Sequence, residues 1–177
     1  MDALPLLAAA AVLVLHQIAG ARRWPPAVMA VLDEPAHLLT AWLILAALPG
    51  GLLKRSLGRW ALVASVAIDL DHIPLYLWGR EFSVDGRPPT HSLAFVLVLL
   101  AIAALLRRTG RERVVGIALG IALHLVRDLA TGPGVPLLWP AYHSSVIVPP
   151  DVYLIAVVAV AVVAAVRPRG GEVRSRA

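Results

Sequence analysis

Residues 60–78 read WALVASVAIDLDHIPLYLW, an apolar run that carries two carboxylates and one imidazole near its C-terminal end. These ionisable residues are Asp69, Asp71 and His72. A carboxylate at the centre of a membrane helix costs roughly 2.5 to 3.5 kcal/mol, so such groups usually face a partner, an ion or a polar interior. The sequence therefore predicts that other parts of the chain supply partners for these three side chains.

The chain as a whole is unusually apolar, since 59% of its 177 residues are hydrophobic and only 15% are charged. Soluble domains contain about 45 to 50% apolar residues, so the composition indicates an integral membrane protein. The absence of cysteine excludes disulfides and thiolate ligands, and any metal must be held by imidazole and carboxylate groups. The formal charge of +5 comes from arginines between apolar runs, which membrane topology explains better than nucleic-acid binding.

The hydrophobic pattern predicts an all-α polytopic bundle of about six transmembrane helices in one domain over residues 1–177. The expected segments are residues 4–19, 35–53, 60–78, 92–106, 114–131 and 152–166. Within the domain we expect an extra N-terminal helix and loop, a metal-site core, and a last helix with a basic tail, at residues 1–34, 35–140 and 141–177. Pro49, Gly50 and Gly51 should mark the end of the second segment.

Lysine and arginine gather in alternate connections, which predicts the orientation of the segments. Eleven basic residues lie within residues 54–59, 107–113 and 167–176. The opposite side has four: Arg22, Arg23, Arg80 and Arg87. With six crossings, both termini are expected on the cytoplasmic side of the inner membrane, although Arg22 and Arg23 run against the bias.

With this topology, seven ionisable residues fall toward the extracytoplasmic face. They are His37, Asp69, Asp71, His72, His91, His124 and Asp128. Residues three or four apart share a helix face, which pairs Asp69 with His72 and His124 with Asp128. Asp71 would join them only if the helix loosens at Ile73–Pro74.

Imidazole and carboxylate groups together suit zinc, with manganese or iron as alternatives, and a shared carboxylate would allow two ions. A bound divalent metal would activate water for hydrolysis in a site that lacks a serine or cysteine nucleophile. Taken singly, the same motifs have plainer interpretations. The Asp-x-Asp-His motif is also typical of a solvated helix end, and residues 90–92 could merely cap the fourth helix.

The order and spacing of these motifs resemble the YdjM-like family of membrane-bound, metal-dependent hydrolases. The resemblance covers residues 37–140 through the motifs Pro35-Ala36-His37, Asp69-Leu70-Asp71-His72, Arg87-Pro88-Pro89-Thr90-His91-Ser92, His124-x-x-x-Asp128-x-x-Thr131 and Gly134-Val135-Pro136-Leu137-Leu138-Trp139-Pro140. The family often has a His-Arg pair and a glycine before Thr-His-Ser, whereas this chain has Gly86-Arg87-Pro88-Pro89. One potential ligand is thus missing here.

The resemblance implies that the seven residues hold one or two divalent ions, with Asp69, Asp71 and Asp128 as the catalytic carboxylates. We expect substrate or ligand-orienting contacts from Thr90, Ser92, Arg127, Thr131 and Trp139. Arg127 could instead be a structural partner of Asp128 or Asp69, and Trp139 an interfacial anchor. His16 is expected to be structural and His143 a loop residue.

The scattered histidines and the His-x-x-x-Asp pair are also similar to zinc-dependent phospholipases C, which favours a lipid phosphoester as substrate and the membrane lipid as partner. No nucleic-acid partner is expected. The main alternative is a non-enzymatic metal-binding or ion-transporting membrane protein. A conduction path needs polar residues at several depths, whereas the expected inner halves carry only His16, Thr40 and Ser65. An assembly factor would leave the convergence of ionisable groups unexplained.

Overall fold

The computed structural model describes residues 2–78 and 83–167. Arg80 and three of the tail arginines, Arg169, Arg174 and Arg176, lie outside the described residues. The helices are α1 (Ala3–Gly20), α2 (Pro26–Ala47), α3 (Ser56–Ala67), α4 (His72–Trp78), α5 (Leu93–Leu105), α6 (Arg108–Asp128) and α7 (Pro150–Val166). Two 3₁₀ turns, η1 (Leu52–Lys54) and η2 (Ile68–Asp71), precede α3 and α4. The described chain is therefore all-α, as predicted.

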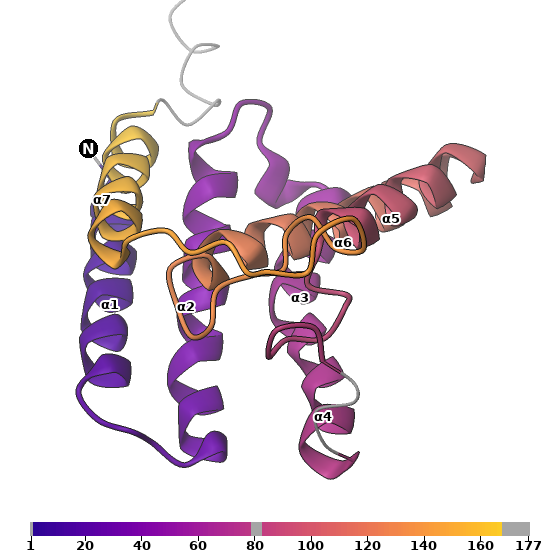
Figure 1. Cartoon of the computed structure of the whole chain (residues 1–177). Helices are drawn as coiled ribbons and strands as arrows, with labels where there is room; N and C mark the ends of the chain where they lie inside the picture. Colours follow the sequence, from indigo (N-terminus) through magenta and orange to yellow (C-terminus); the bar gives the residue numbers. More distant parts are fainter. Residues whose placement is uncertain (1, 79–82, 168–177) are drawn as a thin grey trace, which may run out of the picture.

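The helices form two packed groups that share α2. The first group consists of α1, α2 and α7, whose core contains Val12, Leu43 and Val157. In the second group, α6 packs against α2, α3 and α5. Figure 1 shows that α3 and α4 run in line with each other beside α2, whereas α5 and α6 run across them. The C-terminal end of α6 thereby reaches the middle of α2, where the polar residues gather.

Two glycines allow α6 to lie directly on α3. A Cβ atom on Gly120 would lie 2.2 Å from the carbonyl oxygen of Ala61, and one on Gly116 would lie 2.5 Å from the carbonyl oxygen of Leu57. Small residues at this spacing let two helix backbones approach closely in membrane proteins. This contact fixes the distance between Asp69, which follows α3, and the functional residues of α6.

Two of the expected helix boundaries were wrong. The second segment begins at Pro26, so that Pro35 lies inside α2, and it ends at Ala47, just before Pro49 and the two glycines. Pro35 has no N–H to donate to the preceding turn, but a membrane helix tolerates this loss where neighbouring groups compensate. The boundary expected between residues 34 and 35 therefore falls within a continuous helix. Helix α6 likewise begins at Arg108, six residues before its expected start at Val114. Its first turns therefore contain arginines that were expected in a loop.

The third segment is distorted, but not at the expected place. The break is the 3₁₀ turn η2, and Pro74 lies in the first turn of α4, where proline fits. Residues i and i+3 are eclipsed in a 3₁₀ helix, which aligns Asp69 with His72. Asp71 is brought to the same imidazole because it directly precedes His72. The prediction that the helix loosens was right, but its placement at Ile73–Pro74 was wrong.

Two of the described helices, α1 and residues 27–47 of α2, are long and apolar enough to cross a membrane. Helices α5 and α7 are apolar but shorter, at 13 and 17 residues. At 1.5 Å per residue, α5 measures about 20 Å against a hydrocarbon core of about 30 Å. Six crossings therefore remain a prediction.

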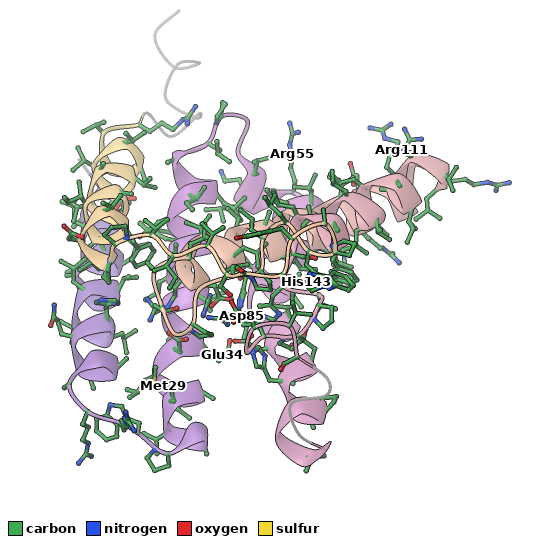
Figure 2. The ribbon with its side chains drawn as sticks, viewed as in Figure 1. Met29, Glu34, Arg55, Asp85, Arg111 and His143 are labelled. Atoms are coloured by element: carbon green, nitrogen blue, oxygen red, sulfur yellow. The ribbon has the colours of Figure 1, made fainter. Side chains whose placement is uncertain are left out.

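The basic connections lie together at one end of the structure. Arg55, after η1, and Arg111, in α6, both point outward at this end (Figure 2). The two ends of the described chain also meet here, since the backbone N–H of Asp2 donates to the carbonyl of Ala165 at 3.0 Å. This shared end agrees with the expected grouping of the arginine-rich connections.

At the level of the site, residues 83–92 and residues 129–149 form two loops that contact each other. Each contains one isolated antiparallel bridge, Val84 with Arg87 and Val135 with Val146. The backbone N–H of Ser145 donates to Asp85 Oδ2 at 2.7 Å and thereby holds the pKa of that exposed carboxyl below its usual range. This contact joins the two loops beside the polar cluster.

Candidate metal centre

The polar cluster lies where α2, η2, the start of α5 and the end of α6 meet. In Figure 2 it is found beside the labelled Glu34, in the middle of the molecule. Four of its residues, His37, His91, His124 and Asp128, are at most 1% exposed. Charges and imidazoles buried this deeply need partners or an ion, because desolvation is otherwise expensive.

Asp69 is at the centre of the cluster. Its Oδ1 lies 3.2 Å from His91 Nε2, 3.3 Å from His124 Nε2 and 3.3 Å from His72 Nδ1. These three imidazoles come from α4, the loop before α5, and α6, so one carboxylate oxygen joins η2 to all three segments. Asp69 is therefore common to two of the three groups of residues that could hold a metal ion.

Asp128 forms the deepest part of the cluster. Its Oδ2 lies 2.9 Å from His124 Nε2, on the same face of α6, and 3.6 Å from His91 Nε2. Its Oδ1 lies 3.5 Å from His37 Nε2 on α2. The ring of His37 stacks on that of His124, with 3.8 Å between centroids and 9° between planes. Asp128 therefore links α2 to α6 at the buried side of the site.

Asp71 occupies the more open side, with its side chain 23% exposed. Its two oxygens lie 3.1 Å from His72 Nδ1 and 3.5 Å from His91 Nδ1. The hydroxyl of Thr90 donates to Oδ2 of the same carboxylate. Asp71 is thus both part of the cluster and close to the outside.

A backbone carbonyl determines how His124 faces the site. Its Nδ1 lies 2.9 Å from the carbonyl oxygen of Ser65, which can only accept a hydrogen bond, so Nδ1 carries the proton. The lone pair of Nε2 then points toward Asp69 and Asp128. Acceptors this close need a cation between them, either an added proton or a metal ion. Metal-binding histidines are commonly oriented in this way through their second nitrogen.

The donor set fits a divalent metal in type, number and spacing. Three overlapping groups bring their ligand atoms within 4.8 Å of one another: Asp69, Asp71, His72 and His91; His37, Asp69 and His124; and His91, His124 and Asp128. Tetrahedral ligands at zinc distances are separated by about 3.4 Å, and the nitrogen–oxygen distances above run from 2.9 to 3.6 Å. Both ring nitrogens of His37 are also buried without a hydrogen bond in the described structure.

The charge of the site favours a cation as well. With neutral histidines, and with Glu34 protonated in its hydrogen bond to Asp69, the aspartates Asp33, Asp69, Asp71 and Asp128 are opposed among the described residues by Arg87 and Arg127. The formal excess of two negative charges within this mostly buried group would be neutralised by one divalent ion. Bound cations are often the largest local charges in such sites.

The structure brings together all seven residues expected as ligands. Of the other residues expected to contact a substrate or a ligand, some lie in the site and others do not. Thr90 lies in the site through its bond to Asp71. Ser92 instead caps α5 by accepting from the N–H of Phe95, which is the plainer of its two interpretations. Thr131 donates to the carbonyl of Arg127 within its own helix end. Trp139 is half-buried in the second loop, and its expected contact with a substrate or the interface stays a prediction.

Arg127 pairs with neither expected partner. Its Nε donates to Asp33 Oδ1 at 2.8 Å, its Nη2 contacts the same oxygen, and its Nη1 lies 3.4 Å from the hydroxyl of Tyr153. The guanidinium is completely buried. Arg127 therefore ties α6 to α2 and α7 and is turned away from Asp69 and Asp128.

Three site residues were missed at the sequence level: Arg87, Asp33, and Glu34, whose side chain is hydrogen-bonded to that of Asp69. Arg87 places Nη1 2.9 Å from Asp128 Oδ2, and its Nε donates to the carbonyl of Gly134 at 2.7 Å. Asp33 Oδ2 lies 3.5 Å from His37 Nε2, one helical turn away. The i, i+4 spacing of Asp33 and His37 was a usable signal, but it was hidden because α2 was expected to begin at Pro35.

Comparison with known families agrees with this geometry. Residues 6–175 match the family described as YdjM inner membrane protein, a match that includes most of α1 and every residue of the cluster. No curated protein and no solved structure matches the chain. Since the match covers nearly the whole sequence, the chain belongs to the YdjM inner membrane protein family.

Proposed function

We propose that this chain is a membrane-embedded, metal-dependent hydrolase that acts on a lipid phosphoester. The observation that carries the proposal is the set of three histidines around Asp69 Oδ1, each at 3.2 to 3.3 Å and from different parts of the chain. A purely structural role would leave this concentration of buried imidazoles and carboxylates without a cation. The family description supports the membrane location.

One or two divalent ions would be held by the seven residues of the cluster, with zinc suited best by the mixture of nitrogen and oxygen donors. When bound, such an ion lowers the pKa of a water ligand toward about 7 and polarises a phosphoryl oxygen. Asp69 would be the central ligand, because its Oδ1 lies within 3.3 Å of three histidines.

The chain's own residues provide the remaining chemistry. Hydrolysis forms a new bond from the oxygen of water to phosphorus, breaks the phosphorus–oxygen ester bond, and delivers a proton to the departing alkoxide. Asp71 is the best-placed proton acceptor, since its side chain is 23% exposed whereas that of Asp128 is 1% exposed. Arg87 replaces Arg127 as the cation beside the site, because Arg127 is occupied by Asp33.

The proposal includes six membrane crossings, cytoplasmic termini and a site that opens to the extracytoplasmic side. Arg55 and Arg111 lie at one end of the molecule, and the cluster with its two loops lies away from that end (Figure 2). The positive-inside rule then assigns the basic end to the cytoplasm.

An ion-transporting protein remains the second candidate, because one observation favours it. Buried polar groups continue from the site through Asp33, Arg127 and Tyr153 to Thr40, whose hydroxyl lies 2.6 Å from that of Tyr153. This chain of contacts reaches deeper into the bundle than the sequence predicted. Metal uptake into sealed proteoliposomes would favour transport, whereas its absence together with phosphoester turnover would favour the hydrolase.

The decisive experiment measures bound metal and phosphodiester hydrolysis in the same purified samples. Wild type should hold at least one divalent ion per chain and release phosphoethanolamine from lysophosphatidylethanolamine. His124→Ala and Asp71→Ala should lose turnover, and His124→Ala should also lose metal. His143→Ala, which changes an exposed loop histidine, is the matched control. A metal-free wild type, or full turnover in Asp71→Ala, would refute the proposal.

A further inference from the structure

An apolar groove of about 530 Å³ lies along the outside of α3, where α3 meets α5 and α6. Trp60 and Val63 line it from α3, Phe95 from α5, and Ile121 from α6. Several of these side chains are exposed although they are large and apolar; Val63, for example, is 57% exposed. In a membrane protein such a groove is in contact with hydrocarbon rather than water.

The groove has one polar end, and that end is the candidate metal centre. All the described residues that line it are apolar except Asp71 and Thr90, which are hydrogen-bonded to each other. Asp71 also lies within 3.5 Å of His72 and His91. Trp60 lies near the beginning of α3, whereas Asp71 follows its end, so the two mark opposite ends of the groove along this helix.

We propose that the groove binds the hydrocarbon chain of a single-chain lipid phosphoester whose polar head lies at Asp71 and Thr90. This inference rests on the proposed function and names the part of the substrate that determines specificity. An amphipathic molecule with one polar end matches the polarity of the groove, since its tail lies against apolar side chains while its head reaches the ionisable cluster. A lipid that merely surrounds the protein would have no reason to place its head there.

The length of the groove predicts a dependence on chain length. Eleven residues separate Trp60 from Asp71, which corresponds to about 16 Å of helix. Because the bilayer around the groove is also hydrocarbon, a bound tail gains packing contacts with the apolar side chains of the groove rather than removal from water. Affinity for lysophosphatidylethanolamine should therefore rise with chain length and level off once the tail extends beyond Trp60.

Photolabelling tests the groove without depending on turnover. The full chain in lipid nanodiscs is irradiated with lysophosphatidylethanolamine that carries a diazirine at the end of its acyl chain, and the labelled residues are mapped by peptide mass spectrometry. Labels should concentrate on α3 and α6 near Trp60 and Ile117, since α6 contacts the Trp60 end of α3 at Gly116. Val63→Trp should fill the groove and reduce this labelling at least about fourfold, because the tail loses its packing contacts there.

Val98→Trp is the matched control, because Val98 is 53% exposed on α5 and does not line the groove. It should leave the labelling pattern and the chain-length preference unchanged. Labels spread evenly over α1 and α7, or an equal loss in the two variants, would overturn the groove assignment even if hydrolysis persists. Concentrated labelling in a protein without turnover would support the groove and refute the hydrolase.

Discussion

Removing one partner of the Asp33–Arg127 pair should destabilise the protein more than removing both. The pair is enclosed between α2, α6 and α7, with Arg127 completely buried and the side chain of Asp33 20% exposed. Loss of one member of a buried pair typically costs 3 to 5 kcal/mol, because it leaves an uncompensated charge. The relevant variants are Arg127→Met, Asp33→Leu and their combination.

The two single variants should lose different amounts of unfolding free energy, because the charge that each leaves behind is buried to a different extent. Arg127→Met leaves a carboxylate that still has access to water, which places its cost near the lower value of about 3 kcal/mol. Asp33→Leu leaves a guanidinium without solvent and with only the hydroxyl of Tyr153 nearby, which places its cost near about 5 kcal/mol. The double variant removes both charges and should therefore lose less than either single variant, that is, less than about 3 kcal/mol.

The free energy of unfolding can be measured by titrating the detergent-solubilised protein with SDS and following loss of tertiary structure. Arg113→Met, at an exposed position of the same helix, is the control and should change stability by no more than about 0.5 kcal/mol. Strictly additive losses, or Arg127→Met within the range of the control, would refute the reasoning. The latter result would return Arg127 to the role of a substrate contact.

Three further outcomes follow from the packing, the topology and the candidate ion. Gly120→Ala should lower the free energy of unfolding by about 1 to 3 kcal/mol, since its methyl group would meet the carbonyl of Ala61 at 2.2 Å. Gly110→Ala, whose nearest neighbour atom is 3.6 Å away, should raise the free energy of unfolding by up to about 1 kcal/mol. Equal effects of the two variants would contradict the close contact between α6 and α3. The chain has no native cysteine, so single cysteines can report the topology. A cysteine that replaces Arg111 should react with an impermeant maleimide only from the cytoplasmic side, and one that replaces His143 only from the opposite side. Labelling of both cysteines from the same side would exclude the topology. Chelation should lower the unfolding free energy by about 2.7 kcal/mol when the free metal had been at 100 times its Kd, and an unchanged value would mean that no ion stabilises the fold.

Residue spacing predicted the members of the cluster better than it predicted the helices that carry them. His124 and Asp128 face the same direction because they are four apart on a regular helix, and Asp69 and His72 meet because they are three apart in either helix type. These pairings depend on local geometry alone. Their convergence with His37 and His91 was inferred from depth in the membrane.

The misplaced boundaries arose where hydropathy and helix formation disagree. Arginine is a good helix former although it is polar, so the chain is helical from Arg108 although the apolar run begins later. Pro35 was interpreted as a helix start, but α2 continues through it from Pro26 to Ala47. That boundary removed Asp33 from consideration, and with it the partner of Arg127. The role of Arg87 depends on how two loops pack together, and the periodicity of the sequence does not predict loop packing.

The 3₁₀ turn at Ile68–Asp71 also constrains how the protein is made. Its carboxylates leave the ribosome well before His91, His124 and Asp128, so in the proposed topology the third segment enters the membrane before most of its partners exist. Until α6 is synthesised, these groups must stay near the headgroups or in contact with the insertion machinery. Chains truncated between α5 and α6 should therefore be handled by quality-control proteases as incompletely inserted intermediates.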